Sequence, residues 1–126
     1  MRMNRKGQFH QKMMQELNLS ESQKAQAKTI FQGAREKAQP LRSQLRADRE
    51  AMRAAVKAND TAQIRSLSAK QGKTRGELTA IRSEAMAKFY ATLTPEQRTK
   101  AEQLHQERTA KMRQRWEERS RSRTGE

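Results

Sequence analysis

The feature that most constrains the fold is a row of apolar residues that recurs at three- and four-residue steps through the first half of the chain. The row runs from Ala27 to Val56 and is interrupted at Asp48. Such steps place side chains on one side of an α-helix, and no segment shows the strict alternation of a strand. The row predicts one long helix from Ser20 to about Ala58. Pro40 lies inside it and should kink the helix without ending it, because the apolar pattern resumes in phase.

A second row predicts another long helix from about Ala62 to Ala91, with the polar residues Gln71 and Thr74 in its middle. Its apolar members are Ile64, Leu67, Leu78, Ile81, Ala85 or Met86, and Phe89. Gly72 and Gly76 lie four positions apart in this segment. Each costs about 1 kcal/mol relative to alanine in a helix, so the pair indicates a close helix crossing, a bend or only a weak stretch.

Shorter signals define the remaining elements. The Asn59-Asp60-Thr61 segment predicts a turn, in which a left-handed asparagine ends one helix and Asp60 or Thr61 caps the next. A short helix is predicted from Phe9 to Leu17. A last helix begins after Thr94 and fades by about Arg119, and along it lie Ala101, Leu104, Met112 and Trp116.

With 126 residues the chain has room for one domain, which we place at residues 9–119, between a flexible basic arm at 1–8 and a disordered tail at 120–126. Only 33% of the residues are hydrophobic and 4% are aromatic, whereas 33% are charged. This composition supplies too little apolar surface for a thick core within one chain and favours a thin helical layer or a dimer. We expect the long apolar seams to pair, as a homodimer. The predicted fold class is all-α, with four helices, two of them long and kinked or curved.

Two copies of a Leu-Ser/Thr-x-x-Gln motif mark the starts of the second and fourth predicted helices. The hydroxyl can accept a hydrogen bond from a free N–H of the first turn, and the glutamine can reach back to the N–H of the capping residue. A proline suits the first helical position, and the leucine before each cap can pin the entering chain onto an apolar surface. The motif residues are Leu19, Ser20 and Gln23, and Leu93, Thr94, Pro95 and Gln97.

The paired motif resembles the LTxxQ signature of the Spy/CpxP family, small periplasmic helical proteins that include an ATP-independent chaperone. The likeness includes residues 9–23, 30–35, 49–53 and 89–97, and it extends over roughly residues 9 to 117. It implies a thin, cradle-like antiparallel dimer in the periplasm. Residues 1–8 lack the apolar core of a signal peptide, so the resemblance implies that a signal has been removed. It also implies that unfolded or partly folded client proteins bind on a concave, positively charged surface with apolar patches.

The charge pattern points to an acidic partner. Lys and Arg number 28 against 14 Asp and Glu, which gives a net charge of +14 at pH 7. Six cations of the second predicted helix lie at steps of seven, four, three, four and four, and therefore form one stripe beside its apolar seam. Such a stripe is either an ordinary solvated face or a client-binding surface, in which arginine attracts acidic segments and also lies against apolar groups. The predicted client-binding residues are Arg35, Arg42, Arg46, Arg49, Met52, Arg53 and Lys57.

Electrostatic binding of nucleic acid or another polyanion is the main alternative. The arginine-rich end of the chain suits phosphate contacts, but no recognition motif is present, so we expect no specific nucleic-acid partner. The cations concerned are Arg108, Lys111, Arg113, Arg115, Arg119, Arg121 and Arg123.

Enzymatic chemistry and metal binding find little support in the sequence. His10 and His105 are far apart, no Gly-rich phosphate loop or paired-carboxylate pocket stands out, and we expect neither an enzyme nor a cofactor. Some relatives in the family sense metals through clustered histidines, which makes a metal or stress sensor a further alternative; this chain has no His-x-x-x-His. Met13 and Met14 fit packing better than a soft metal. No apolar run reaches membrane-spanning length, so we expect no membrane insertion.

Overall fold

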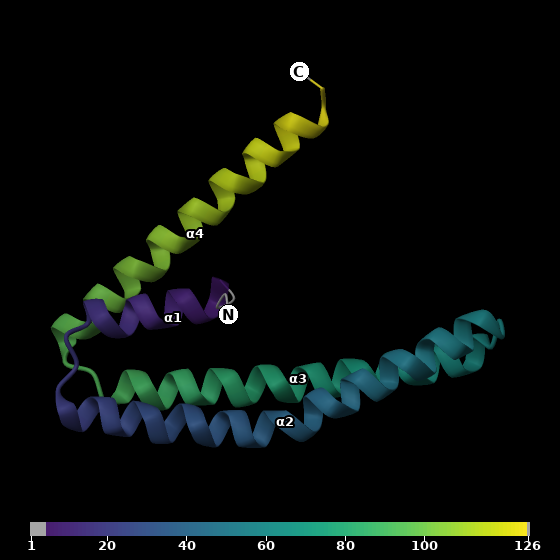
Figure 1. Ribbon diagram of the computed structural model, residues 1–126, viewed down its shortest axis with the longest axis horizontal. Helices are drawn as coiled ribbons and strands as arrows, with labels where there is room; N and C mark the ends of the chain where they lie inside the picture. Colours follow the sequence, from purple (N-terminus) through teal and green to yellow (C-terminus); the bar gives the residue numbers. More distant parts are fainter. Residues whose placement is uncertain (1–4, 126) are drawn as a thin grey trace. The chain divides into compact units, whose positions relative to one another are not determined.

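The computed structural model describes residues 5–125, and the side chains of residues 11–125. The described residues form four α-helices and no strand, as predicted (Figure 1). The helices are α1 (Arg5–Glu16), α2 (Glu21–Lys57), α3 (Thr61–Ala91) and α4 (Pro95–Arg123). They belong to two compact units: residues 24–92 form one, and the segments before and after them form the other.

The unit of residues 24–92 is an antiparallel hairpin of α2 and α3 (Figure 1). The predicted turn is present: Asn59 has a left-handed backbone with φ of 51°, and the side chain of Asp60 accepts a hydrogen bond from the backbone N–H of Gln63 at 3.1 Å. The rings of Phe31 and Phe89 lie 5.5 Å apart between the two helices. The buried apolar residues of the unit are Ala27, Ala38, Leu45, Ala55, Leu67, Ala85 and Phe89.

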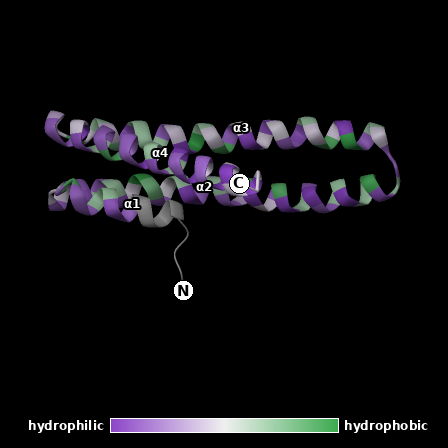
Figure 2. Ribbon diagram, turned by 90° about the horizontal axis from the view of Figure 1, so that it is seen from above, coloured by the Kyte–Doolittle hydropathy of each residue, from purple (hydrophilic) through white to green (hydrophobic). Residues whose placement is uncertain are grey.

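Four of these seven residues are alanines, so the contact between α2 and α3 is narrow. In agreement with this, Figure 2 shows that hydrophilic positions predominate along both helices, with hydrophobic positions interspersed. Small side chains let two helices approach closely but contribute little apolar area each, at roughly 25 cal/mol per Å² buried. The stability of the hairpin therefore depends on the length of its two helices, because small contacts are distributed over many turns.

A polar group interrupts this contact near its middle. Asp48 is only 3% exposed, and its Oδ1 lies 3.4 Å from Lys70 Nζ and accepts a hydrogen bond from Gln44 at 3.4 Å. Its Oδ2 has no hydrogen-bond partner among the described residues. Thr74 is also buried and donates to the carbonyl of Lys70 at 3.1 Å. The interruption predicted at Asp48 is thus a buried carboxylate that faces a lysine of the opposite helix, which favours one register of the hairpin.

Pro40 does not end α2, which is continuous from Glu21 to Lys57. The kink expected at this proline stays a prediction. Of the interpretations considered for Gly72 and Gly76, a close crossing with another helix of the described chain does not occur. Both residues are exposed, and a Cβ built on either would meet no atom within 4 Å, because the two positions are turned away from α2.

The second unit contains α1, α4 and the segments that lead into α2 and α4. Its buried apolar residues are Met13, Leu17, Leu19, Leu93, Ala101 and Leu104. Lys100 of α4 forms a 4.0 Å ion pair with Glu16 of α1. The apolar row predicted for the last helix is buried only as far as Leu104, since Met112 and Trp116 are 57% and 68% exposed.

Both ends of the chain differ from prediction. α1 begins at Arg5, not at Phe9, and residues 5–8 contain no proline that would prevent a helix. Residues 1–4 of the expected arm, and the side chains of Phe9 and His10, lie outside the described residues. α4 continues to Arg123, so residues 120–123 of the expected disordered tail are helical. Residues 96–124 contain no proline or glycine, and Arg121 and Arg123 are favourably placed at the negative end of the helix dipole. α4 is consequently 29 residues long, nearly as long as α3.

Replacing Asp48 by leucine should stabilise the hairpin. The change removes a buried carboxylate with one unsatisfied oxygen and joins Leu45 and Met52 into one apolar row, so we expect the free energy of unfolding to rise by about 1 kcal/mol or more in urea titrations. Lys70→Ala, which leaves the buried charge without its partner, should lower it. A loss of stability in Asp48→Leu comparable to that in Lys70→Ala would show that the pair is a net stabilising contact.

Candidate functional site

Both predicted capping boxes are present, one at the start of α2 and one at the start of α4. Gln23 N donates to Ser20 Oγ at 3.1 Å, and Ser20 N donates to Gln23 Oε1 at 2.9 Å. The second box repeats the arrangement: Gln97 N donates to Thr94 Oγ1 at 3.2 Å, and Thr94 N donates to Gln97 Oε1 at 2.9 Å. Pro95 is the first residue of α4, where its missing N–H costs nothing. The leucines before the caps, Leu19 and Leu93, are 7% and 5% exposed.

The two glutamines of the motifs also hydrogen-bond to each other across 74 residues of sequence. Gln23 Nε2 donates to Gln97 Oε1 at 2.7 Å, and Gln97 Nε2 donates to Gln23 Oε1 at 3.1 Å. Gln97 Nε2 makes a further hydrogen bond, at 3.2 Å, to the carbonyl of Leu17 at the end of α1. This reciprocal amide pair joins the starts of α2 and α4 to the end of α1.

Gln97 uses its complete hydrogen-bonding capacity in this arrangement. A side-chain amide has one oxygen with two acceptor sites and one nitrogen with two donor hydrogens. The oxygen accepts from Thr94 N and Gln23 Nε2, and the nitrogen donates to Gln23 Oε1 and Leu17 O. Sequence reasoning found each capping box separately but missed this contact. The available signal was that both boxes carry glutamine: glutamate serves equally well in a capping box, but two glutamates could not donate to each other.

The predicted cationic stripe is exposed along α2. At 100° per residue its six cations lie within an arc of roughly 80°. None of them forms an ion pair with a carboxylate of the described residues; the polar contacts of the stripe are Arg35 Nε to the carbonyl of Phe31 at 3.5 Å and Arg46 Nη2 to Ser43 Oγ at 3.0 Å. The stripe consists of Arg35, Arg42, Arg46, Arg49, Arg53 and Lys57, all exposed.

Partly exposed apolar side chains lie on both sides of the buried row of α2. Met52, the seventh predicted client-binding residue, is half-buried, as are Phe31 and Leu41. Viewed down α2, the buried row of Ala27, Ala38 and Leu45 lies roughly 70° around the helix from the centre of the stripe. The structure therefore brings the six cations together on one flank of the contact between α2 and α3, with the half-buried Phe31 at their inner edge. Met52 and Leu41 lie on the other side of the buried row.

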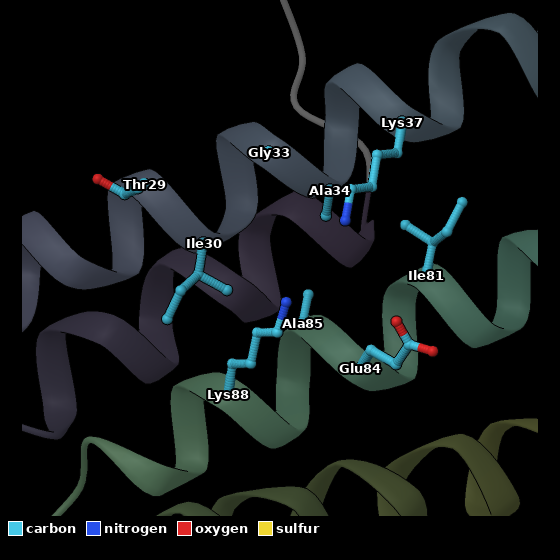
Figure 3. A pocket seen from close by; sticks show the side chains of 9 residues that line it. All are labelled: Thr29, Ile30, Gly33, Ala34, Lys37, Ile81, Glu84, Ala85 and Lys88. Atoms are coloured by element: carbon cyan, nitrogen blue, oxygen red, sulfur yellow. The ribbon is translucent and has the colours of Figure 1, made fainter.

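The other flank of the same contact carries a groove that sequence reasoning missed. It has a volume of about 230 Å³ and lies between α2 and α3 (Figure 3). Its apolar lining comes from two isoleucines and two alanines, and its polar lining includes two lysines, one from each helix, and a glutamate. The lining residues are Thr29, Ile30, Gly33, Ala34, Lys37, Ile81, Glu84, Ala85 and Lys88. The sequence signal was the small pair Gly33-Ala34, which leaves space beside the opposite helix.

The described residues offer little for metal or membrane-spanning chemistry. No three His, Cys, Asp or Glu side chains among them gather into a possible metal site. His105 is exposed on α4. None of the described helices is long and apolar enough to cross a membrane. The arrangement instead presents cations and apolar groups side by side, which suits reversible binding of a polymer that is both acidic and apolar.

Comparison with known proteins gives one finding. The model of the family described as "LTXXQ motif family protein" matches residues 5–105, a range that contains both capping motifs and the whole hairpin. The comparisons with curated proteins and with solved structures give no match. The resemblance seen in the sequence is thus confirmed for the family.

The amide pair predicts that Gln97→Glu destabilises the protein more than the loss of a cap does. Glutamate still accepts from Thr94 N, but it cannot donate to Gln23 Oε1 or Leu17 O, and it leaves two acceptors without their donor. We expect a loss of about 1 to 3 kcal/mol in the free energy of unfolding, against about 1 kcal/mol for Thr94→Ala.

The exposed Gln103 of the same helix provides the matched control, since Gln103→Glu makes the same chemical change away from the motifs. In a double-mutant cycle, Gln23→Ala and Gln97→Ala should be strongly non-additive. Additive effects, or equal losses in Gln97→Glu and Gln103→Glu, would contradict the role given to the amide pair.

Proposed function

We propose that this chain, which belongs to the LTXXQ motif family, is an ATP-independent chaperone that binds unfolded or partly folded proteins and suppresses their aggregation. The surface that we assign to clients is the hairpin of α2 and α3, with the cationic stripe on one flank and the groove on the other. The protein works by binding and release, not by catalysis. The family suggests the periplasm as its compartment.

One observation carries this proposal above the others: six exposed cations lie in a row, without carboxylate partners among the described residues, beside partly exposed apolar side chains. A solvated helix face would be expected to intersperse both signs of charge, which pair at three- and four-residue spacing. Within α2 only Glu50 has this spacing, at four residues from Arg46 and three from Arg53, and no ion pair joins it to either. The positive potential of the stripe is therefore available to a client.

The physical sequence of events follows from the range of each interaction. Attraction between charges acts over roughly 8 to 10 Å at ordinary ionic strength, so acidic segments of a client are captured first. Apolar contacts with Met52 or the groove act only at van der Waals distance and add affinity afterwards. Because the apolar patches are small and the arginines stay hydrated, each contact is weak. A client can therefore leave and fold between contacts.

A homodimer forms part of the proposal. The narrow, alanine-rich contact between α2 and α3 leaves apolar side chains such as Met52 partly exposed, which a second copy could cover. The antiparallel, cradle-like arrangement with kinked long helices is the one that the family resemblance implies. We expect sedimentation to show a dimer at tens of micromolar protein, with weaker association at low salt because both copies carry +14. A compact monomer as the sole species at these concentrations would contradict the dimer.

The stripe is tested by replacing Arg42, Arg46, Arg49 and Arg53 together by glutamine, which keeps the helix propensity close to that of arginine. Association with an acidic unfolded client should slow, and its dependence on salt should flatten, because the long-range attraction is reduced. Stability should change little, since exposed charges contribute about 0 to 1 kcal/mol each. Suppression of aggregation without nucleotide and stopped-flow association over a salt series provide the two measurements.

The matched control removes four cations of α4 in the same way, at Arg113, Arg115, Arg119 and Arg121. It changes the net charge equally but leaves the hairpin untouched, so it should impair chaperoning less. If the α4 variant loses activity while the stripe variant keeps its association rate and salt dependence, the protein is a general polyanion binder.

Gly33→Met separates the groove from the stripe: it fills the groove without a clash at Cβ and should weaken client binding while the helix gains stability.

A further inference from the structure

The distal half of α4 carries a largely exposed face that the proposed client surface does not use; its Arg108 is half-buried and has a contact within the chain. The buried positions Ala101 and Leu104 continue along the same side of the helix into residues that are not buried. At 100° per residue, these residues fall within an arc of roughly 100°. They are Arg108, Met112, Arg115, Trp116, Arg119 and Arg123, which we call the α4 face. Trp116 is 68% and Met112 57% exposed, values that are high for large apolar side chains.

The carboxylates of this segment avoid the α4 face. Within α4 beyond Leu104 they are Glu107, Glu117 and Glu118, and all three lie outside the arc of the α4 face. The face therefore combines four guanidinium groups with one indole and one thioether and contains no acid. The rest of the segment mixes its three acids with the cations Lys111, Arg113 and Arg121. A helix that only contacts water has no reason to keep its acids away from the side that carries its tryptophan and its methionine.

We propose that the α4 face docks reversibly on the surface of an anionic phospholipid bilayer. The guanidinium groups would bind lipid phosphates, for which their planar, bidentate geometry is suited. Trp116 and Met112 would lie at the level of the headgroups, where an indole finds both an apolar environment and a hydrogen-bond acceptor. The opposite side, which mixes acids and cations, would face water. This docking is independent of the proposed client binding, which uses other residues.

Two other occupants fit the face less well. A second copy of the chain would bring the same arginines against one another, and its net charge of +14 adds repulsion. A stable protein interface needs roughly 20 to 30 residues from each partner, far more than this face presents. A bilayer needs no complementary shape: one strip of cations with two apolar anchors is enough for weak, salt-sensitive adsorption, because each Arg near an anionic surface strengthens binding roughly fivefold.

The chain contains its own probe for this proposal, since Trp116 is its single tryptophan. Titration with vesicles of equal parts phosphatidylglycerol and phosphatidylcholine should shift the tryptophan emission to the blue, saturably and less at high salt. Vesicles of phosphatidylcholine alone should give no shift. Sedimentation of the protein with the vesicles supplies a second readout that does not depend on fluorescence.

Two double variants with the same change in charge decide whether the face matters. Arg115→Gln/Arg119→Gln removes two cations from the face and should weaken vesicle binding roughly 30-fold. Arg113→Gln/Arg121→Gln removes two cations of the same helix that lie outside the arc, and it should weaken binding much less. All four arginines are exposed, so both variants should keep the thermal stability of the parent. Met112→Ala, by sedimentation, should also weaken binding.

Three results would overturn the proposal. The first is the absence of both the emission shift and co-sedimentation with anionic vesicles. The second is an equal loss in the two double variants, which would mean that net charge alone governs the attraction. The third is a shift with single-stranded DNA that depends on Arg115 and Arg119 while vesicles have no effect, which would make the face a nucleic-acid site.

Discussion

The reciprocal hydrogen bonds between the Gln23 and Gln97 amides are the contact on which this fold depends most. They connect the first turns of α2 and α4, and through the carbonyl of Leu17 they hold the end of α1. Each amide oxygen also closes its own capping box, so the geometry of both helix starts and their mutual position are set by the same two side chains. This explains physically why two distant copies of one short motif occur in a chain with little apolar core. Directional polar contacts supply the specificity that a thin core cannot.

The hairpin of α2 and α3 also has only a small apolar core. Its buried row is rich in alanine, its largest fully buried side chain is Phe89, and a carboxylate occupies its middle. Such a contact is narrow enough to leave both flanks of the helix pair open to solvent. The cationic stripe and the groove occupy these two flanks. The narrow contact therefore accounts both for the thin core and for the surface that is available for binding. A wider apolar contact would stabilise the hairpin further, but it would bury the residues that we assign to clients.

Local chemistry decided what could be predicted from the sequence. The two long helices, the left-handed Asn59, the Asp60 cap and both capping boxes depend on residues within four positions of one another, and all were predicted. The amide pair, the Asp48–Lys70 contact and the groove join residues on different helices, and periodicity does not specify which sides of two helices meet. Gly72 and Gly76 illustrate the limit: their spacing resembled a helix crossing, yet they face solvent. The exposure of Met112 and Trp116 was missed for the same reason, since a regular apolar step does not show where the covering helix ends.

The cationic stripe and the α4 face have similar charge but different apolar neighbours, and this difference gives them different physics. Net charge alone cannot distinguish partners, because attraction at long range sums over the whole chain and its +14. Selection must therefore come from contacts at short range. On the hairpin these are a half-buried methionine and a groove lined by small aliphatic side chains, which suit the varied side chains of an unfolded protein. On α4 they are an exposed indole and an exposed thioether between arginines, a combination suited to the boundary between water and lipid. One strongly basic chain can thus hold two surfaces that both attract acidic partners. The apolar groups beside the charge then determine which partner each surface prefers.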